Sequence, residues 1–421
     1  MQPPQLADVR HGKAGLCAVL FLILATGCSA HWEKRRLPEW SKTGAAAPLH
    51  WSDHRAPELE PLVSRHCAPF MEQGKSIGLA VAVISGSNST IMTFGRASLV
   101  SDQPLPSDTL FEIGSITKTF TALALAQEIQ RGNLSLDDPI QGLMPAGLQL
   151  PKEARPVTLR HLTTHTSGFP RLPDNMSFWH SFRRVMAGGN PYDDYSEARF
   201  LDAIRTVDLD FKPGTKIEYS NFGMDVLGYL LSAKAGTDYE AYIKREVCEP
   251  LGMHDTTITL TTNEAARFAQ GYCFAIRKGA VLKVLDSDPW NLPNHLAGSG
   301  ALRSTVADML KYLELNMHPA GSLGGAIRAS HSELFHEKDG FTIGMNWVRS
   351  PSKRLGTVIW HNGAMGSASS YLGFTEDGRV GVVVLSNVGL EGVDDLARAI
   401  LRELKQPATV PSVSDHASVS P

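Results

Sequence analysis

Apolar positions that alternate with polar ones, or run uninterrupted, occur at both ends of the main body of the chain. Near its start, Ile77 to Ile84 and Ser89 to Phe94 are typical of strands, and the turn residues Ser85 to Asn88 separate them, which predicts a hairpin. Near its end the strand pattern returns in four segments. These are Phe341 to Val348, Thr357 to Trp360, Ser370 to Phe374 and Val380 to Leu385.

Between these strands, apolar residues recur at the spacing of helices. The predicted helices are Thr117 to Gln130, Thr158 to Thr164, Ser196 to Thr206, Asn221 to Lys234 and Tyr239 to Val247. A further helix, Pro57 to Gln73, precedes the first strands, and another, Val393 to Lys405, follows the last. The order predicts an α+β fold, in which one antiparallel sheet is built from both chain ends, flanked by helices, with a mostly helical region inserted.

The N-terminal residues 1–28 are interpreted as a signal peptide. Arg10 and Lys13 precede the apolar run Ala14 to Ala25, which is shorter than the roughly 20 residues of a membrane-spanning helix. The run ends in Ala-Thr-Gly-Cys, which resembles the lipobox of bacterial lipoproteins except that Ala25 stands where Leu is usual. The resemblance implies lipidation of Cys28 and a membrane anchor; the alternative is an ordinary signal cut after Ala30.

The remaining chain is predicted to form one domain. Residues 29–55 mix charge, Pro and Ala without periodicity and are interpreted as a linker. The domain spans 56–405, and residues 406–421 are expected to form a disordered tail. Together with the signal, this order predicts an exported, periplasmic and membrane-anchored protein, or a soluble secreted one.

Composition narrows the classes of function. Of 421 residues, 43% are hydrophobic and 20% are charged, and the formal net charge is -3, so the chain should fold and has no long-range attraction to nucleic acid. His161 and His165 lie four apart without an acidic third ligand, and we interpret them as packing residues; no metal and no cofactor is expected. Cys67, Cys248 and Cys273 remain in the domain. An odd number of cysteines is not typical of a disulfide framework, but it allows one disulfide between two of them.

The first candidate for chemistry is Ser115-Ile-Thr-Lys118, which opens a predicted helix. The backbone N–H groups and dipole of a helix start favour negative charge and disfavour a cation, so the amine of Lys118 should lose its proton readily. A neutral amine one turn from a hydroxyl can activate it as a nucleophile. The alternative is that Ser115 is an N-cap and Lys118 a surface residue. Ser350-Pro-Ser-Lys353 matches the same pattern, but we place it in a turn between strands.

Two further motifs are ambiguous alone. In Tyr219-Ser-Asn221, a phenol can exchange protons with an amine and an amide can hold a substrate carbonyl; equally, Tyr219 packs at a helix entrance and Asn221 caps the helix. In His361-Asn-Gly363, the Asn-Gly pair predicts a tight hairpin turn. The functional alternative is that Gly363 admits a substrate backbone and His361 offers a donor to an anion.

Together, Ser-x-x-Lys, Tyr-x-Asn and His-x-Gly in this order resemble the serine β-lactamase (class C) and DD-peptidase family, with its D-aminopeptidases and esterases. The segments Phe111 to Ala122, Leu159 to Pro170, Phe211 to Gly236 and Gly298 to Leu313 also resemble it, so the likeness spans most of 60–400. It implies a β-lactamase/transpeptidase-like fold. It also implies that the insertion at Arg171 to Tyr195 helps to build the acyl pocket.

The resemblance implies roles for the matching residues. Ser115 would form the acyl-enzyme, Lys118 and Tyr219 would share the general-base role, and Asn221 would orient the substrate amide. The backbone N–H groups of Ser115 and Ala364 would form the oxyanion hole. Class C β-lactamases typically have Lys where His361 stands, which argues against potent β-lactam hydrolysis.

The predicted function is an exported serine acyl-hydrolase, a D-Ala-D-Ala carboxypeptidase or endopeptidase or a D-amino-acid peptidase acting on cell-wall peptides. The expected partners are peptidoglycan-type peptides or other small acyl substrates, and β-lactams as covalent ligands. The alternatives are a β-lactamase or a carboxylesterase of the same family, and a non-catalytic penicillin-binding or scaffold protein.

Overall fold

The computed structural model describes residues 50–101, 103–176, 181, 184, 190–277, 280–337, 340–389 and 392–405. The predicted signal peptide with Cys28, the linker up to residue 49 and the tail 406–421 lie outside the described residues. So do parts of the segment from Arg171 to Tyr195. Among the described helices, none is both long enough and apolar enough to cross a bilayer.

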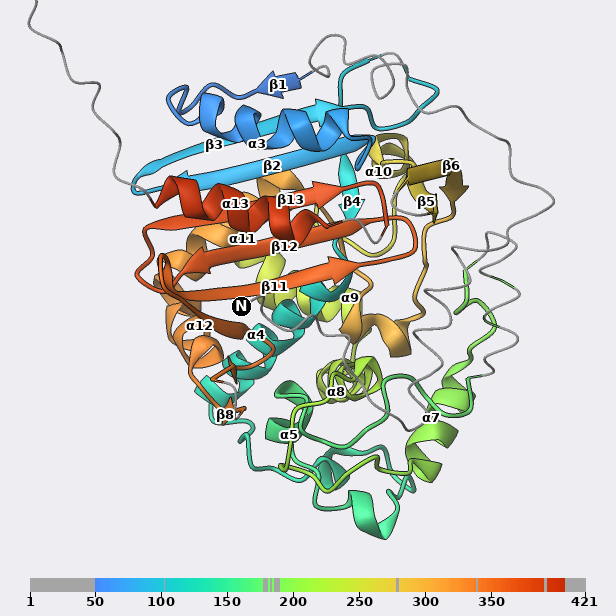
Figure 1. Cartoon of the computed structure of the whole chain (residues 1–421). Helices are drawn as coiled ribbons and strands as arrows, with labels where there is room; N and C mark the ends of the chain where they lie inside the picture. The colour runs from blue at the N-terminus through green and yellow to red at the C-terminus, as the bar shows by residue number, and fades with distance from the viewer. Residues whose placement is uncertain are drawn as a thin grey trace, which may run out of the picture.

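The centre of the fold is a nine-stranded sheet in the order β1-β3-β2-β13-β12-β11-β10-β9-β8, in which all neighbours are antiparallel (Figure 1). The N-terminal hairpin therefore joins the C-terminal strands where β2 pairs with β13, and the predicted α+β fold is confirmed. The strands are β1 (His50–Ser52), β2 (Gly78–Ser85), β3 (Asn88–Gly95), β8 (Phe335–His336), β9 (Thr342–Ile343), β10 (Val348–Ser352), β11 (Gly356–Ala364), β12 (Ser369–Thr375) and β13 (Val380–Ser386).

Each face of the sheet is covered by a different set of helices, because side chains along a strand alternate between the faces. In β2, Leu79, Val81 and Val83 belong to one core with α3 (Glu60–Glu72) and α13 (Val393–Leu404). Ala80, Ala82 and Ile84 belong to the other core, with the helical region. Both faces of β2 are thus buried, which explains its continuous apolar sequence.

The helical region lies between the two halves of the sheet in the sequence, and the part of it that is coloured green lies below the sheet in Figure 1. Several of its helices begin at a Ser, Thr or Asp whose side chain accepts a backbone N–H, for example Ser196 and Ser220. The helices are α4 (Thr117–Gln130), α5 (Leu159–Thr163), α7 (Glu197–Thr206), α8 (Asn221–Lys234), α9 (Tyr239–Ile243), α10 (Thr262–Arg267), α11 (Val306–Met317) and α12 (Gly324–His331).

Three elements differ from the predictions. The predicted strand Phe341 to Val348 is interrupted, because Asn346 has a left-handed backbone (φ 58°) and its N–H donates to Thr163 O at 2.8 Å. β1 lies within the predicted linker 29–55 and pairs with β3. The predicted Asn362-Gly363 hairpin turn is wrong, since both residues lie inside β11 and pair with β12.

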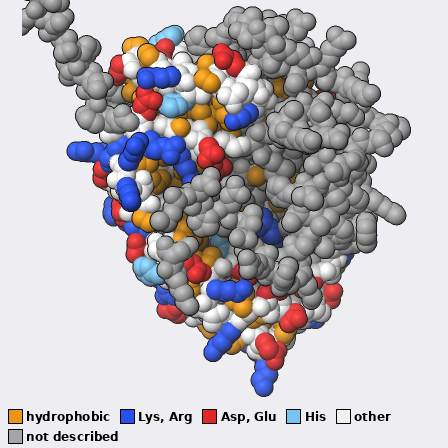
Figure 2. Space-filling view, in the orientation of Figure 1, with side chains coloured by type: hydrophobic (Ala, Val, Ile, Leu, Met, Phe, Trp, Pro, Cys, Tyr) orange, Lys and Arg blue, Asp and Glu red, His pale blue; other side chains and the backbone are white. Residues whose placement is uncertain are grey.

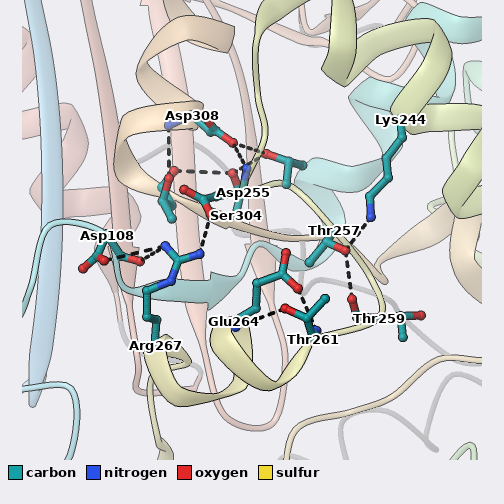
Figure 3. A network of polar contacts seen from close by, with 12 residues as sticks. Asp108, Lys244, Asp255, Thr257, Thr259, Thr261, Glu264, Arg267, Ser304 and Asp308 are labelled. Carbon is teal, nitrogen blue, oxygen red and sulfur yellow. Dashed lines mark hydrogen bonds and ion pairs between the residues drawn. The ribbon is translucent and has the colours of Figure 1, made fainter.

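Polar contacts hold the segment that leads to Ser115 (Figure 3). Arg267 at the end of α10 binds Asp255 and donates to Asp108 O at 3.0 Å, two residues before the short strand β4 (Leu110–Glu112). Asp308 on α11 in turn accepts the N–H of Asp255 at 2.8 Å. β4 pairs with β7 (Arg303–Thr305). This pairing fixes the path of the backbone that leads from β4 to Ser115.

On the face seen in Figure 2, basic and acidic side chains both occur across the described part, with hydrophobic side chains between them. The three described cysteines form no disulfide with one another. Cys67 and Cys248 are buried, and burial raises the pKa of both thiols. The folded part described here is therefore stabilised by packing and hydrogen bonds, without a cross-link.

β11 packs against the turn that carries Ser115, and the contact needs a glycine. A Cβ on Gly363 would lie 2.1 Å from Ile113 O and 2.4 Å from Ser370 Oγ. The hydroxyl of Ser370 also donates to Ile113 O at 2.8 Å. The close approach at Gly363 is thus with the chain's own backbone, whereas the functional alternative considered from the sequence was approach of a substrate backbone.

Gly363→Ala should therefore push β11 away from Ser115. We expect a loss of about 1–3 kcal/mol in the free energy of unfolding, the usual effect of overpacking. Thermal or urea unfolding measures this loss. Gly142→Ala is the matched control, because a Cβ there meets nothing within 4 Å. Equal stability of the two variants would contradict the packing argument.

Candidate active site

Ser115 lies in a 3-10 turn, Gly114–Ile116, that runs directly into α4. Gly114 has φ +49°, and a Cβ on it would lie 3.0 Å from the Ala364 nitrogen. The turn and the end of β11 are thus neighbours, as the predicted oxyanion hole requires. Neither the turn nor α4 has a side-chain N-cap hydrogen bond, so Ser115 is not a helix cap.

Lys118 lies in the first turn of α4 and is fully buried. Its Nζ donates to Ser115 Oγ at 3.0 Å and to Ser299 O at 2.6 Å. Burial, reinforced by the nearby charge of Arg171, holds the pKa of Lys118 well below its usual value, although Asp225 opposes this. The uncharged amine is therefore favoured beside the hydroxyl, and the surface-residue alternative is wrong.

Asp225 is a site residue that the sequence analysis missed. It is buried on α8, and its Oδ1 accepts the N–H of Ser299 at 3.0 Å, while the carbonyl of the same Ser299 accepts from Lys118. Burial raises the pKa of Asp225 well above its usual value. A signal was present in the sequence, since Asp225 is the one acidic residue of α8 and has apolar residues directly before and after it.

Tyr219 is surrounded by nitrogen-bearing side chains. Lys118 Nζ lies 4.8 Å from the centroid of its ring and Arg171 Cζ lies 5.2 Å from it, while the rings of His165 and His361 have centroids at 4.4 and 6.4 Å. Burial raises the pKa of Tyr219 to about 12, although a hydrogen bond with Ser115 and the charge of Arg171 lower it. At neutral pH, Tyr219 is thus a protonated phenol, which leaves Lys118 as the group able to accept a proton.

Asn221 is the first residue of α8, and the helix is capped by its neighbour. The Ser220 hydroxyl accepts the Gly223 N–H at 2.8 Å, so the capping role considered for Asn221 is wrong. The side-chain oxygen of Asn221 is buried and has no hydrogen-bond partner among the described residues. A buried amide oxygen without a partner is destabilising unless a ligand supplies a donor.

His361 lies on β11 and is buried. Its Nδ1 lies 2.6 Å from Asn362 O; because a carbonyl only accepts, Nδ1 carries the proton. Burial lowers the pKa of His361 to about 3, and the Lys118 charge adds to this. The neutral ring therefore has an unprotonated Nε2, and the donor role predicted for His361 would need a second proton.

A second buried carboxylate, Glu112, connects the Ser115 segment to the turn after β11. It accepts the N–H of Trp290 at 2.9 Å and the hydroxyl of Ser367. Burial raises the pKa of Glu112, while the hydrogen bond from Ser367 and the charge of Arg303 lower it. Glu112 lies in the segment Phe111 to Ala122 that resembles the family, but the sequence indicated no role for it.

The other candidate motifs supply neither a second Ser-Lys pair aligned on a helix nor, in the described part of the chain, a metal site. Ser350 to Ser352 belong to β10 and Lys353 follows in a turn, so no helix aligns that pair. In the described part of the chain, no group of three His, Cys, Asp or Glu residues could hold a metal. His165 is buried, and its Nδ1 accepts the Ser220 N–H at 3.2 Å, which makes it a packing residue beside Tyr219.

A cavity of about 510 Å³ lies away from this cluster. None of the residues predicted for the site lines it, so we place no step of the chemistry there. Its lining includes Pro104, Pro106, Ala265, Phe268 and Pro289.

The chain is similar to known proteins over most of its length. The family model "Beta-lactamase" matches residues 63–406. The chain is 27% identical to a beta-lactamase of Pseudomonas fluorescens, over 83% of this chain and 100% of that protein. It is 24% identical to the D-alanyl-D-alanine-carboxypeptidase/endopeptidase AmpH of Escherichia coli K12, over 77% of this chain and 83% of AmpH. A crystal structure of a beta-lactamase/D-alanine carboxypeptidase from Yersinia pestis superposes with a TM-score of 0.69 at 22% identity, covering 83% of this chain and 99% of that one.

The pKa of Lys118 predicts how the reactivity of Ser115 depends on pH. The neutral amine is the form that accepts a proton, so labelling by a fluorophosphonate should slow as pH falls through the Lys118 pKa and level off above it. The midpoint should lie well below the usual lysine value. Rapid-quench labelling across the pH range measures it.

Lys118→Arg tests the same point, since a guanidinium keeps its proton throughout this range. We expect the labelling rate to fall by about 10²–10⁴-fold, the usual contribution of a general base. A variant as fast as the parent would exclude Lys118 as the base.

Proposed function

The chain belongs to the Beta-lactamase family and is a serine hydrolase, and on that premise we propose that it is a D-Ala-D-Ala carboxypeptidase or endopeptidase, or a D-amino-acid peptidase, acting on cell-wall peptides. One observation carries the proposal. The Ser115 hydroxyl accepts a hydrogen bond from a fully buried Lys118 amine at 3.0 Å. A hydroxyl next to an uncharged amine is an activated nucleophile.

In the proposed reaction, Ser115 attacks the substrate carbonyl while Lys118 takes the hydroxyl proton. Tyr219, a neutral phenol in contact with Ser115, relays that proton to the leaving amine. The backbone N–H groups of Ser115 and Ala364 stabilise the oxyanion, and the free amide oxygen of Asn221 binds a donor of the substrate. Water then attacks the acyl-enzyme. The same groups transfer the proton of this water in the reverse direction, so that Ser115 regains its hydroxyl proton.

Neutral His361 favours a peptidase over a potent β-lactamase. A β-lactam is held in part by its carboxylate, and burial keeps the pKa of His361 near 3, so the ring supplies no positive charge at neutral pH. A D-Ala-D-Ala peptide also ends in a carboxylate, so the substrate that isolates this effect is its C-terminal amide, and we expect turnover of the amide to exceed turnover of nitrocefin. A short-chain ester in the same assay tests the carboxylesterase alternative, which predicts that the ester is the substrate turned over fastest.

Mass spectrometry of a fluorophosphonate or penicillin adduct tests the nucleophile. The added mass should lie on the peptide that contains Ser115, and Ser115→Ala should not be labelled. Ser350→Ala is the matched control, because Ser350 begins the second Ser-x-x-Lys match and should keep full labelling. An adduct at any other residue, or binding without hydrolysis of any of the three substrates, would overturn the enzyme proposed.

We also propose that the protein is exported and anchored through lipidated Cys28, which agrees with a cell-wall substrate. Incorporation of labelled palmitate should be lost in Cys28→Ala, and the variant should leave the membrane fraction. A mature chain that begins at His31 would show instead the ordinary signal cleavage.

A further inference from the structure

Arg171 is held at the edge of the site by its own backbone. Its carbonyl accepts the N–H groups of Asn221 at 3.1 Å and Phe222 at 3.3 Å, and the preceding Pro170 carbonyl accepts the Ser220 hydroxyl at 2.8 Å. The first N–H groups of a helix have no partner within the helix. In α8, the carbonyl of Arg171 supplies that partner. The position of Arg171 is thereby fixed relative to Asn221.

The side chain of Arg171 is exposed and faces Tyr219, with Cζ at 5.2 Å from the ring centroid. None of the ion pairs among the described residues involves it. Its charge acts on the catalytic cluster, where it lowers the pKa of both Lys118 and His165. An exposed guanidinium without an acidic partner among the described residues is available to pair with an incoming anion.

Among the described residues of this cluster, Arg171 is the one arginine. The Lys118 amine favours its neutral form, and His361 donates through Nδ1 to its own strand and carries no charge. An arginine keeps its proton under all these conditions and pairs with carboxylates through two parallel hydrogen bonds. Arg171 is therefore the residue of this cluster that can bind an anionic group of the substrate.

We propose that Arg171 forms an ion pair with a carboxylate carried by the acyl part of the substrate. The acyl part is indicated because Arg171 is tied through its backbone to Asn221, the residue proposed to hold the substrate amide, whereas Ala364, which is proposed to bind the oxyanion, lies on β11. The inference rests on the proposed function, since it needs an acyl-enzyme at Ser115. It restricts the substrates to acidic acyl groups, such as those of acidic peptides.

Two esters with one leaving group test this inference. Mono-p-nitrophenyl adipate and p-nitrophenyl hexanoate have acyl chains of equal carbon number and differ in a terminal carboxylate against a methyl group. The ratio of their kcat/KM values isolates the carboxylate, because every shared step cancels. The wild-type full-length protein should prefer the adipate, and Arg171→Gln should lower the ratio about 10- to 100-fold, mainly through KM.

Controls separate this inference from the function on which it rests. Loss of hexanoate hydrolysis in Ser115→Ala shows that the acyl-enzyme mechanism holds, whatever happens to the ratio. Arg205→Gln, at an exposed arginine in the last turn of α7, should leave the ratio unchanged, and Arg171→Lys should restore part of it.

Three results would overturn the assignment of Arg171. One is a wild-type ratio that Arg171→Gln does not change. Another is a ratio that falls in His361→Gln instead, or that declines between about pH 6 and 8, as a titrating histidine would require. The third is a variant that loses discrimination between a D-Ala-D-Ala peptide and its C-terminal amide but not between the two esters, which would place the carboxylate on the leaving group.

Discussion

The site depends on the burial of one amine. Lys118 is enclosed at the start of α4, a helix buried through most of its length, and water does not reach its Nζ. Desolvation of this kind favours the neutral form of a lysine. The two hydrogen bonds from Nζ then fix its direction, one to the Ser115 hydroxyl and one to the Ser299 carbonyl.

Three contacts hold the segments around Ser115 and Lys118 in place. β11 lies against the Ser115 turn because Gly363 has no side chain to hold it away. Asp225 fixes Ser299, and Glu112 joins the turn after β11 to the strand that leads into Ser115. Buried polar groups that are satisfied in this way make the arrangement of a site unique, whereas unsatisfied ones would destabilise it.

The charges near Ser115 are distributed unequally. Lys118, Tyr219 and His361 are all shifted toward uncharged forms by burial, while Arg171 keeps its charge at the exposed edge. Proton transfer and anion recognition are thereby separated. The uncharged groups can exchange a proton with a hydroxyl, and the charged one can pair with a carboxylate.

The sequence alone was sufficient for the α+β order and for the bounds of α4 and α8, because these depend on local periodicity. That the three motifs meet around Ser115 was expected only from the resemblance to a known family. The local sequence pattern gave two wrong predictions. Asn362-Gly363 was predicted to form a turn but lies inside β11, and the predicted strand Phe341 to Val348 is interrupted at Asn346, whose backbone is left-handed. The tertiary structure alone decided that burial is the main cause of the neutral Lys118 amine, that His361 is neutral, and that Asp225, Glu112 and Arg171 make their contacts at the site. Burial and long-range contact set those properties, and neither is a function of neighbouring residues in the chain.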